Sequence, residues 1–299
     1  MKKQKKYISL FLAITLLFIT THSQPPNYTT PTYGRTKVDR GTFSDIAKNP
    51  SRDNILKLQM LSIIQGSANA KYNPNAALTK QEAAAYIIRM LGQEKAAQEK
   101  AAAMTKAGTR PNYIADSWAI GYMEELLSQG ILTNEELREM ETLSKAQLDS
   151  IEKQVNAEAR KGWMTLAQRD NLRNERQAAA RLQNKNMRSY ISRQDLALWL
   201  SRALGAEETS QDNTNATYVY NDYEEIKPNN LQAVATLLQS KVIEGASKTK
   251  YNPTGAIKRS EAADIFNRAI KAYPEALGIT TDVARVTNTD NTYELESSG

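Results

Sequence analysis

Two cationic positions in the chain have the surroundings of an anion-binding site. Lys80 follows Thr79 in the run Thr-Lys-Gln-Glu, and Arg259 follows Lys258 in the run Lys-Arg-Ser-Glu. Thr79 and Glu82 have the spacing of a capping box, in which Thr79 is the helix N-cap and Glu82 returns a hydrogen bond from the third helical position. The cation therefore falls at the first helical position, where we expect it to point outward beside unpaired backbone N–H groups. A helix N-terminus with an added cation favours a bound carboxylate.

Both runs belong to a segment that the chain carries twice. Residues 66–90 read GSANAKYNPNAALTKQEAAAYIIRM, and residues 245–269 read GASKTKYNPTGAIKRSEAADIFNRA. The shared Tyr-Asn-Pro predicts a turn, because proline fixes its own φ and disfavours a helical conformation at the preceding asparagine. The apolar spacing after Glu82 predicts an amphipathic helix that ends at Gly92. The chain therefore repeats a supersecondary unit.

A first helix is predicted before each repeated segment. Phe43-Ser44-Asp45-Ile46 opens one unit, and Tyr220-Asn221-Asp222-Tyr223 opens another at the equivalent place. A further opening, Ile114-Ala115-Asp116-Ser117-Trp118, has its matching second half only at residues 190–195, Tyr-Ile-Ser-Arg-Gln-Asp. We therefore expect three units of two helices each, with the middle unit interrupted.

These residues resemble the S-layer homology family. Repeats of that family open with an aromatic-x-Asp signature and continue through a helix into Gly-Ile-Ile-x-Gly. An aromatic-x-Pro turn and a Thr-Arg-Ala-Glu tetrad then open a second helix. The tetrads of this chain are Thr79-Lys80-Gln81-Glu82, Ser192-Arg193-Gln194-Asp195 and Lys258-Arg259-Ser260-Glu261. The resemblance implies an all-α fold, in which three repeats pack as a pseudo-threefold helical trimer with grooves between neighbouring repeats.

The resemblance also implies a binding protein rather than an enzyme. In that family the grooves hold cell-wall polysaccharide, often an acidic, pyruvylated secondary polymer, and the second residue of the tetrad contacts the anionic group. The expected partner is therefore a cell-wall polysaccharide or peptidoglycan, bound by a secreted protein at the cell wall or in a surface layer. The candidate ligand-binding residues are Lys80, Arg193, Arg259, Lys258, Trp118, Asp45, Asp116, Asp222, Gly66 and Gly245.

Several of these candidates have a second, structural interpretation. The tetrads can act as helix caps alone, and Asp45, Asp116 and Asp222 can hold the turn of each unit. Trp118 can contact a sugar or pack in the core, whereas an apolar helix around Trp199 places that residue in the core.

The three grooves are expected to be unequal. Lys80 binds an anion as a point charge and lacks the two-pronged donor set of arginine. Lys258 stands where a hydroxyl N-cap belongs, so the third unit loses a cap while it gains a second cation.

The remaining segments are assigned from composition. Four lysines and the apolar run at residues 8–20 predict a cleaved secretory signal peptide, and no later segment predicts a membrane span.

The insertion in the middle unit predicts helices with capping boxes at Ser144 with Gln147 and Thr165 with Gln168. It is interpreted as an arm folded on the trimer, or as an arm that binds a surface-layer or envelope protein. The full plan is a signal peptide (1–23), a linker (24–42), repeat 1 (43–92), a helical connector (93–111), repeat 2 (112–205) with an insertion at about 135–186, a linker (206–219), repeat 3 (220–271) and a flexible tail (272–299).

Residue counts exclude several classes of site. The 299-residue chain has no cysteine and one histidine, His22, which lies in the predicted signal peptide. The exported chain would then have neither residue, which excludes Ser-His-Asp and Cys-His catalysis and His/Cys zinc sites. No catalytic residue, metal or cofactor is predicted.

Charge gives no reason to expect a nucleic-acid partner. Loss of the signal lysines leaves 35 basic against 33 acidic residues, a net charge of +2. Two other functions remain open. One is a helical envelope scaffold that recruits a protein through the insertion. The other is a carbohydrate-active enzyme with an Asp/Glu pair, although no such pair is nominated by the sequence.

Overall fold

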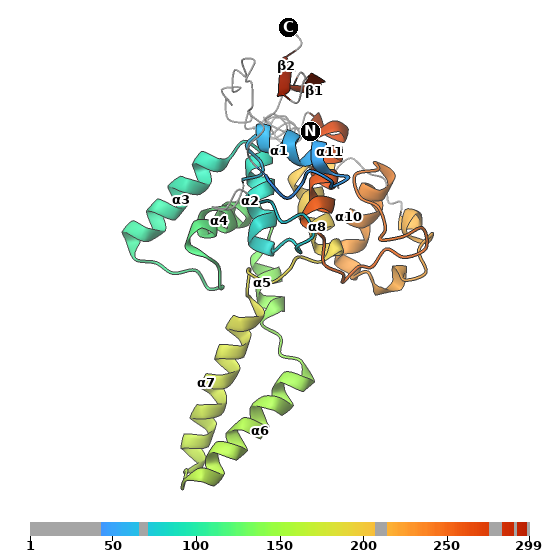
Figure 1. Ribbon diagram of the computed structural model, residues 1–299. Coiled ribbons are helices and arrows are strands. Elements are labelled where there is room, and N and C mark those ends of the chain that lie inside the picture. Colours follow the sequence, from blue (N-terminus) through green and yellow to red (C-terminus); the bar gives the residue numbers. More distant parts are fainter. Residues whose placement is uncertain (1–42, 66–70, 207–213, 275–282, 290–291, 298–299) are drawn as a thin grey trace, which may run out of the picture. The chain divides into compact units, whose positions relative to one another are not determined.

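The computed structural model describes residues 43–65, 71–206, 214–274, 283–289 and 292–297 (Figure 1). The chain divides into two compact units, residues 1–31 and 32–299, and every described residue belongs to the second. The predicted signal peptide, the linker that follows it and Gly66 therefore lie outside the described residues.

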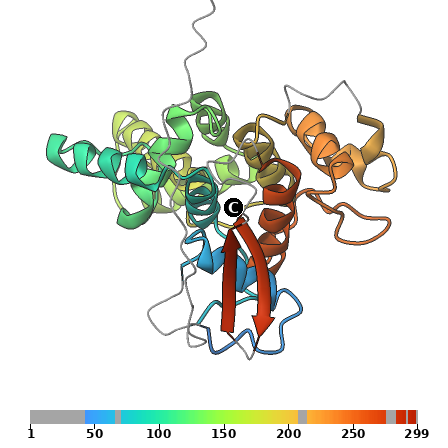
Figure 2. The ribbon, with the colours of Figure 1, turned by 90° about the horizontal axis from the view of Figure 1, so that it is seen from above.

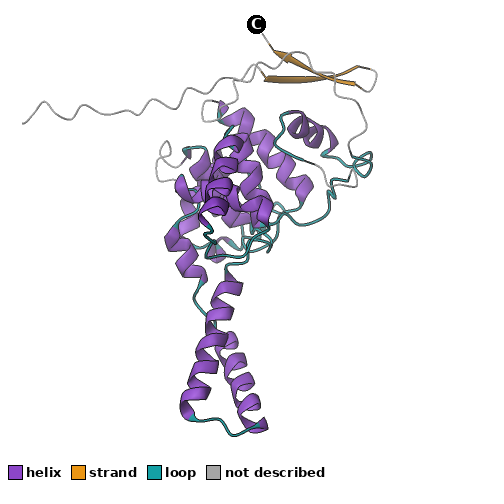
Figure 3. Ribbon diagram, turned by 90° about the vertical axis from the view of Figure 1, so that its left-hand side faces the viewer, coloured by secondary structure: helices purple, strands orange, loops and turns teal. Residues whose placement is uncertain are grey.

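Helices dominate the described chain, and the predicted all-α, mainly helical class is confirmed (Figure 3). The α-helices are α1 (Arg52–Met60), α2 (Lys80–Met90), α3 (Glu94–Ala107), α4 (Ile120–Ser128), α5 (Asn134–Met140), α6 (Lys145–Lys161), α7 (Leu166–Asn184), α8 (Arg193–Ala203), α10 (Pro228–Gln239) and α11 (Arg259–Ala272). Three short 3-10 helices are η1 (Ser117–Ala119), η2 (Thr214–Thr217) and η3 (Tyr223–Glu225).

Two short strands follow the helices. β1 (Val283–Thr289) and β2 (Thr292–Ser297) pair antiparallel (Figure 2). They fall within residues 272–299, for which the sequence predicts a flexible tail. Part of that segment therefore has a regular, paired backbone that its lack of helical periodicity did not predict.

Side-chain caps fix where the second helices of the units begin. The Thr79 hydroxyl accepts a hydrogen bond from the Glu82 N–H, and the Glu82 carboxylate accepts one from the Thr79 N–H, which is the predicted capping box. Ser192 caps α8 by accepting from the Asp195 N–H at 3.1 Å. Lys258 provides no side-chain cap for α11, as predicted from the missing hydroxyl at this N-cap position.

The helices pack in a cyclic order. The first helices of the three units are α1, α4 and α10, and the second helices are α2, α8 and α11. α4 packs on α2, α10 on α8, and α1 on α11, so each first helix lies against the second helix of another unit. This packing of helices from different units forms one hydrophobic core. Its completely buried side chains include Ile55, Leu58, Ile87, Met123 and Phe266. Each such side chain contributes about 1.5–3 kcal/mol of hydrophobic stabilisation.

Backbone hydrogen bonds join the three units in a ring where the second helices begin. In each helix, the first two N–H groups donate to two carbonyl oxygens in the turn of a neighbouring unit. The pairs are Lys80 to Ser189 and Gln81 to Met187, Arg193 to Gly255 and Gln194 to Pro253, and Arg259 to Ala76 and Ser260 to Pro74, all at 2.9 or 3.0 Å. The same two bonds thus recur at three junctions, and the third junction connects the last unit back to the first.

The insertion has two parts, and the first of them packs on the middle unit. Leu137 of α5 is buried in the core. Arg202 of α8 donates to the Glu136 carboxylate at 2.9 Å and to the Ile131 carbonyl oxygen at 3.0 Å. A capping box of Thr133 and Glu136, which the sequence analysis did not identify, begins α5.

The second part is a hairpin of α6 and α7, which lie side by side in Figures 1 and 3. Both predicted capping boxes are present at the starts of these helices. Ile151 and Val155 of α6 are buried, and Arg173 of α7 pairs with Glu152 of α6 at 2.8 Å. The hairpin is therefore a preformed element with its own small interface.

Candidate functional site

The backbone N–H groups at the helix starts are already bonded within the protein. The ring uses the first two N–H groups of α2, α8 and α11, and Thr79 and Ser192 use the third N–H groups of α2 and α8. The prediction of unpaired N–H groups beside the tetrad cations is therefore wrong. The acceptors come from the turns of neighbouring units, which the sequence of one repeat does not reveal.

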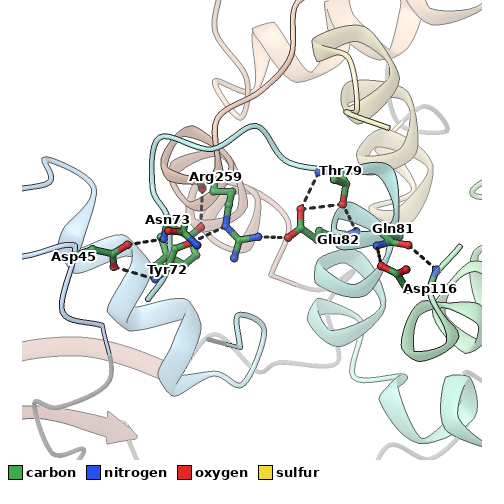
Figure 4. A network of polar contacts seen from close by, with 8 residues as sticks. All are labelled: Asp45, Tyr72, Asn73, Thr79, Gln81, Glu82, Asp116 and Arg259. Carbon is green, nitrogen blue, oxygen red and sulfur yellow. Dashed lines mark hydrogen bonds and ion pairs between the residues drawn. The ribbon is translucent and has the colours of Figure 1, made fainter. Parts of the chain in front are cut away.

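Arg259 binds within the protein and does not point outward (Figure 4). Its Nε donates to the Tyr72 carbonyl oxygen at 2.7 Å, and its Nη1 forms an ion pair with Glu82. Its Cζ lies 4.8 Å from the centroid of the Tyr72 ring, in a cation–π contact. Only 12% of the Arg259 side chain is exposed. Because Tyr72 and Glu82 belong to the first unit, Arg259 joins the third unit to the first.

Arg193 has the equivalent place at the junction of the second and third units. Its Nη1 forms an ion pair with Glu261 and donates to the Glu244 carbonyl oxygen at 3.1 Å, and 5% of its side chain is exposed. The expectation that Arg259 points outward is thus wrong, and Arg193 is turned inward in the same way, since each arginine meets a carboxylate of the neighbouring unit. Their predicted contact with a ligand stays a prediction.

The aspartates that open the first and third units hold turns. Asp45 accepts hydrogen bonds from the backbone N–H groups of Tyr72 at 2.9 Å and Asn73 at 2.7 Å (Figure 4), and Asp222 makes the two equivalent bonds in the third unit. Asn73 has a φ of 58°, the left-handed conformation that asparagine tolerates better than most residues. Burial by itself raises the pKa of each carboxyl, but the N–H donors outweigh it, so the pKa of both lies below its usual value.

Asp116, in the middle unit, makes different contacts. Its carboxylate accepts a hydrogen bond from the Gln81 side chain at 2.6 Å and pairs with Arg188 at 2.8 Å. The hydrogen bond from Gln81 is the main cause that lowers the pKa of Asp116, and Arg188 lowers it further. Because Gln81 lies in the first turn of α2, this aspartate ties the middle unit to the first (Figure 4).

Lys80 is the exception among the tetrad cations. By the cyclic order, its counterpart in the middle unit is Asp195. That carboxylate instead accepts from Lys227 Nζ at 3.2 Å and Asn230 Nδ2 at 3.1 Å. Across the described residues, neither an ion pair nor a hydrogen bond engages the Lys80 ammonium. Burial lowers the pKa of Lys80, and the charge of Asp195 offsets this only in part.

A groove of about 440 Å³ opens at this junction. Leu132, Met140 and Trp199 form its apolar part. Its polar lining comprises the side chains of Lys80, Thr133, Arg202, Lys227, Asn229 and Asn230, together with the carboxylates of Asp195 and of Glu135, Glu136 and Glu139 on α5. An apolar surface with hydrogen-bonding groups around it suits a sugar ring, which has C–H faces and hydroxyl edges.

The other predicted site residues that the structure describes lie outside this groove. Lys258 is exposed, and Trp118, which is 48% exposed, packs edge-on against Tyr122. The Gly245 N–H donates to the Tyr220 hydroxyl at 3.0 Å, and a Cβ at this glycine would lie 2.3 Å from the tyrosine ring. Gly245 therefore allows a close approach of the backbone to an aromatic side chain.

Most residues of the groove were missed by the sequence analysis. Glu135, Glu139 and Met140 lie on α5, which was assigned to the insertion because it falls between the two halves of the middle unit. Lys227 and Asn230 had a usable signal. Pro228 occupies the first position of α10, and a proline there marks a helix start that would have placed these polar side chains at a helix N-terminus.

Two other kinds of site are not found in the described part of the chain. It contains no group of histidine, cysteine, aspartate and glutamate side chains placed to hold a metal ion. None of the described helices has both the length and the apolar character needed to cross a bilayer.

Comparison with known families gives one match in two places. The model of the S-layer homology domain matches residues 42–84 and residues 219–263. Each matched segment runs from the opening of a unit into the first turn of its second helix, so the first and third units carry the match. The middle unit, which the insertion divides, lies outside both segments. A comparison with curated proteins finds no match.

Proposed function

The chain is an S-layer homology domain protein, and we propose that it binds a cell-wall polysaccharide non-covalently through the groove beside Lys80. S-layer homology domains are in general anchoring modules of cell walls and surface layers, and they bind secondary cell-wall polymers. On this proposal the protein is exported and held at the cell surface. It acts as a binding protein, in keeping with a family of binding domains.

The observation that carries this proposal is that no ion pair or hydrogen bond engages the Lys80 ammonium within the described part of the chain. At the other two junctions, a carboxylate of the neighbouring unit neutralises the tetrad cation. An acidic substituent of a polymer, such as a pyruvyl carboxylate, would supply the missing anion at Lys80. Its sugar ring would then lie over Met140, the apolar side chain of the groove that is only half-buried, and Lys227 would offer a second cation at the same groove.

Sedimentation of the purified protein with cell walls tests the proposal, before and after extraction of the acidic polymer. Lys80→Ala should lower the affinity for intact walls about tenfold or more, because a charge-assisted hydrogen bond contributes about 1.5–3 kcal/mol. The matched control is Lys95→Ala, which removes a cation whose side chain is 90% exposed on α3 and outside the groove.

Each outcome of this test has a definite meaning. Unchanged binding by Lys80→Ala would place the ligand elsewhere on the protein. Equal binding to extracted walls would make peptidoglycan, rather than an acidic polymer, the partner.

A further inference from the structure

The α6–α7 hairpin ends in apolar side chains that nothing in the described chain covers. Trp163 is fully exposed and Leu166 is 78% exposed, while Met164 between them is half-buried. Single exposed apolar residues are common on protein surfaces, but exposed apolar side chains that lie next to one another can form an interaction surface. We call residues 160–166, together with Arg169, the hairpin tip.

Cations flank the apolar residues on both helices. Arg160 and Lys161 end α6, and Arg169 lies in the first turn of α7. With Trp163 and Met164, they line a hollow of about 560 Å³. Lys161 pairs with the exposed Glu158 at 3.2 Å, whereas no ion pair engages Arg160 among the described residues. The tip therefore combines aromatic and aliphatic side chains with positive charge.

The hairpin holds this tip in a defined conformation. The capping box of Thr165 and Gln168 sets the start of α7, and the Arg169 guanidinium donates to the Asn156 side chain on α6 at 2.8 Å. Buried Ile151 and Val155 keep α6 against α7. The exposure of Trp163 is thus a property of a folded, capped hairpin.

We propose that the hairpin tip binds the headgroup region of an anionic phospholipid membrane. Trp163 and Leu166 enter the interface, and Arg160 and Lys161 lie against lipid phosphates. Tryptophan is favoured at the level of the headgroups, and basic residues near an anionic leaflet add electrostatic attraction. The tip penetrates the interface without spanning the bilayer, as amphipathic surface elements do.

The exposure of Trp163 favours a membrane over an acidic sugar. A tryptophan that stacks on one sugar binds best when neighbouring groups already fix its ring, because ordering a free side chain on binding costs entropy. Trp163 is exposed on all sides, which suits the laterally disordered headgroup layer. The proposal is independent of the Lys80 groove, and it requires only that export bring the protein to the outer surface of a membrane.

Sedimentation with lipid vesicles tests this proposal. The protein used is the chain from Gln24, which lacks the apolar run at residues 8–20 and contains every described residue. We expect it to bind vesicles of phosphatidylglycerol mixed with phosphatidylcholine, to bind pure phosphatidylcholine weakly, and to lose binding as salt is raised. Trp163→Ser should weaken binding to the anionic vesicles by about fivefold or more, and Arg160→Gln with Lys161→Gln should remove most of the salt dependence.

The matched control is Tyr190→Ser, which removes another exposed aromatic side chain (62% exposed) outside the hairpin and should bind vesicles like the unaltered chain. Thermal unfolding of Trp163→Ser should be unchanged, because its ring makes no buried contact. Equal vesicle binding by Trp163→Ser and the unaltered chain would overturn the proposal. So would an oligomer in solution that Trp163→Ser dissociates, or a loss of cell-wall binding in Trp163→Ser while vesicle binding persists. The vesicle assay and the wall assay with Lys80→Ala fail or succeed separately.

Discussion

Arginine and lysine at the second tetrad position lead to different junctions between units. Arg193 and Arg259 reach a backbone carbonyl and a carboxylate of the neighbouring unit at once, which their forked donor groups allow. Lys80 has a single ammonium group, and the carboxylate at its junction belongs to Asp195, which is shorter than the glutamates at the other two. The ion pair between Lys80 and Asp195 does not form, and a groove remains. Two changes of residue type, lysine for arginine and aspartate for glutamate, thus separate the two closed junctions from the open one.

Arg259→Ala is expected to destabilise the protein. It removes an ion pair to Glu82 and a 2.7 Å hydrogen bond to the Tyr72 carbonyl in a mostly buried place. The free energy of unfolding should fall by about 2–3 kcal/mol, as for other charge-assisted hydrogen bonds whose partner is left unpaired. Arg259→Lys should lose less than Arg259→Ala, because the charge survives. Urea denaturation measures both.

The contrast with Lys80→Ala is the control for this prediction. That variant should keep its stability and lose wall binding, whereas Arg259→Ala should lose stability first. If Arg259→Ala unfolds like the unaltered chain yet binds walls poorly, the arginine contacts ligand as the sequence resemblance implies.

The turn-holding aspartates predict how stability depends on pH. The pKa values of Asp45, Asp116 and Asp222 are lowered in the folded protein, so folding favours the ionised carboxyl groups. The stability that these ionised carboxyl groups contribute is complete above the pKa of an unfolded aspartate, near 3.9. It is lost as the pH falls through the lower pKa values of the folded protein. The free energy of unfolding should therefore decrease between about pH 5 and pH 2.

Urea unfolding at a series of pH values measures this dependence. Asp45→Asn should be less stable than the unaltered chain at neutral pH, and its free energy of unfolding should decrease less as the pH is lowered. An acid profile for Asp45→Asn that is parallel to that of the unaltered chain would show that this carboxyl does not contribute.

At the scale of elements, the insertion divides into a helix that lines the groove and a hairpin that does not. α5 provides Glu139 and Met140 to the groove and buries Leu137 in the core. The hairpin begins after an ion pair between Glu141 and Lys185, whose atoms are 2.6 Å apart. Its two ends are therefore already close together.

Removal of residues 143–183, with a short Gly/Ser bridge, should leave a folded protein that still binds walls. The Asn184 side chain donates to the Thr142 carbonyl oxygen at 3.2 Å, so a few residues can span the gap. A larger deletion, of residues 135–186, should unfold more easily and lose wall binding, because it removes α5. Circular dichroism melting and wall sedimentation compare the two variants. Loss of cooperative melting in the shorter deletion would mean that the hairpin supports the core.

Local elements were the predictable part of this fold. Residues close together in the sequence determine the turns and the burial of Trp199, and also the capping boxes at Thr79, Ser144 and Thr165. These features were therefore predictable from local sequence patterns. The direction of Arg259 was not predictable, because it depends on Tyr72, 187 positions away. Lys80 was predicted as a site residue from its place at a helix start, and this stays a prediction; the groove beside it comes from elements that only the packing brings together.

At the scale of the whole described core, the ring of backbone hydrogen bonds makes the three units interdependent. Each unit supplies carbonyl acceptors to one neighbour and N–H donors to the other, and each first helix packs on another unit. A unit that opened alone would leave buried polar groups unpaired at two junctions, which costs more than local fraying.

Hydrogen exchange should therefore show one common opening at the three junctions. The amides of Lys80, Arg193 and Arg259 are equivalent in the ring, and they should exchange at similar rates that follow the global free energy of unfolding. Mass spectrometry of peptides that span each tetrad measures these rates. Much faster exchange at one junction would mean that its unit opens independently.

The closure of this ring between the first and last units also determines when the protein can fold. The carbonyl groups of Pro74 and Ala76 bond to N–H groups of α11, and α1 packs on the same helix. A chain that is threaded through a secretion channel from its N-terminus delivers α1 and this turn long before α11. Until α11 emerges, the first unit has an uncovered apolar face and unpaired acceptors. If the chain is exported as we propose, folding would await nearly complete translocation, and until then the emerging chain would be open to chaperones and proteases on the far side of the membrane.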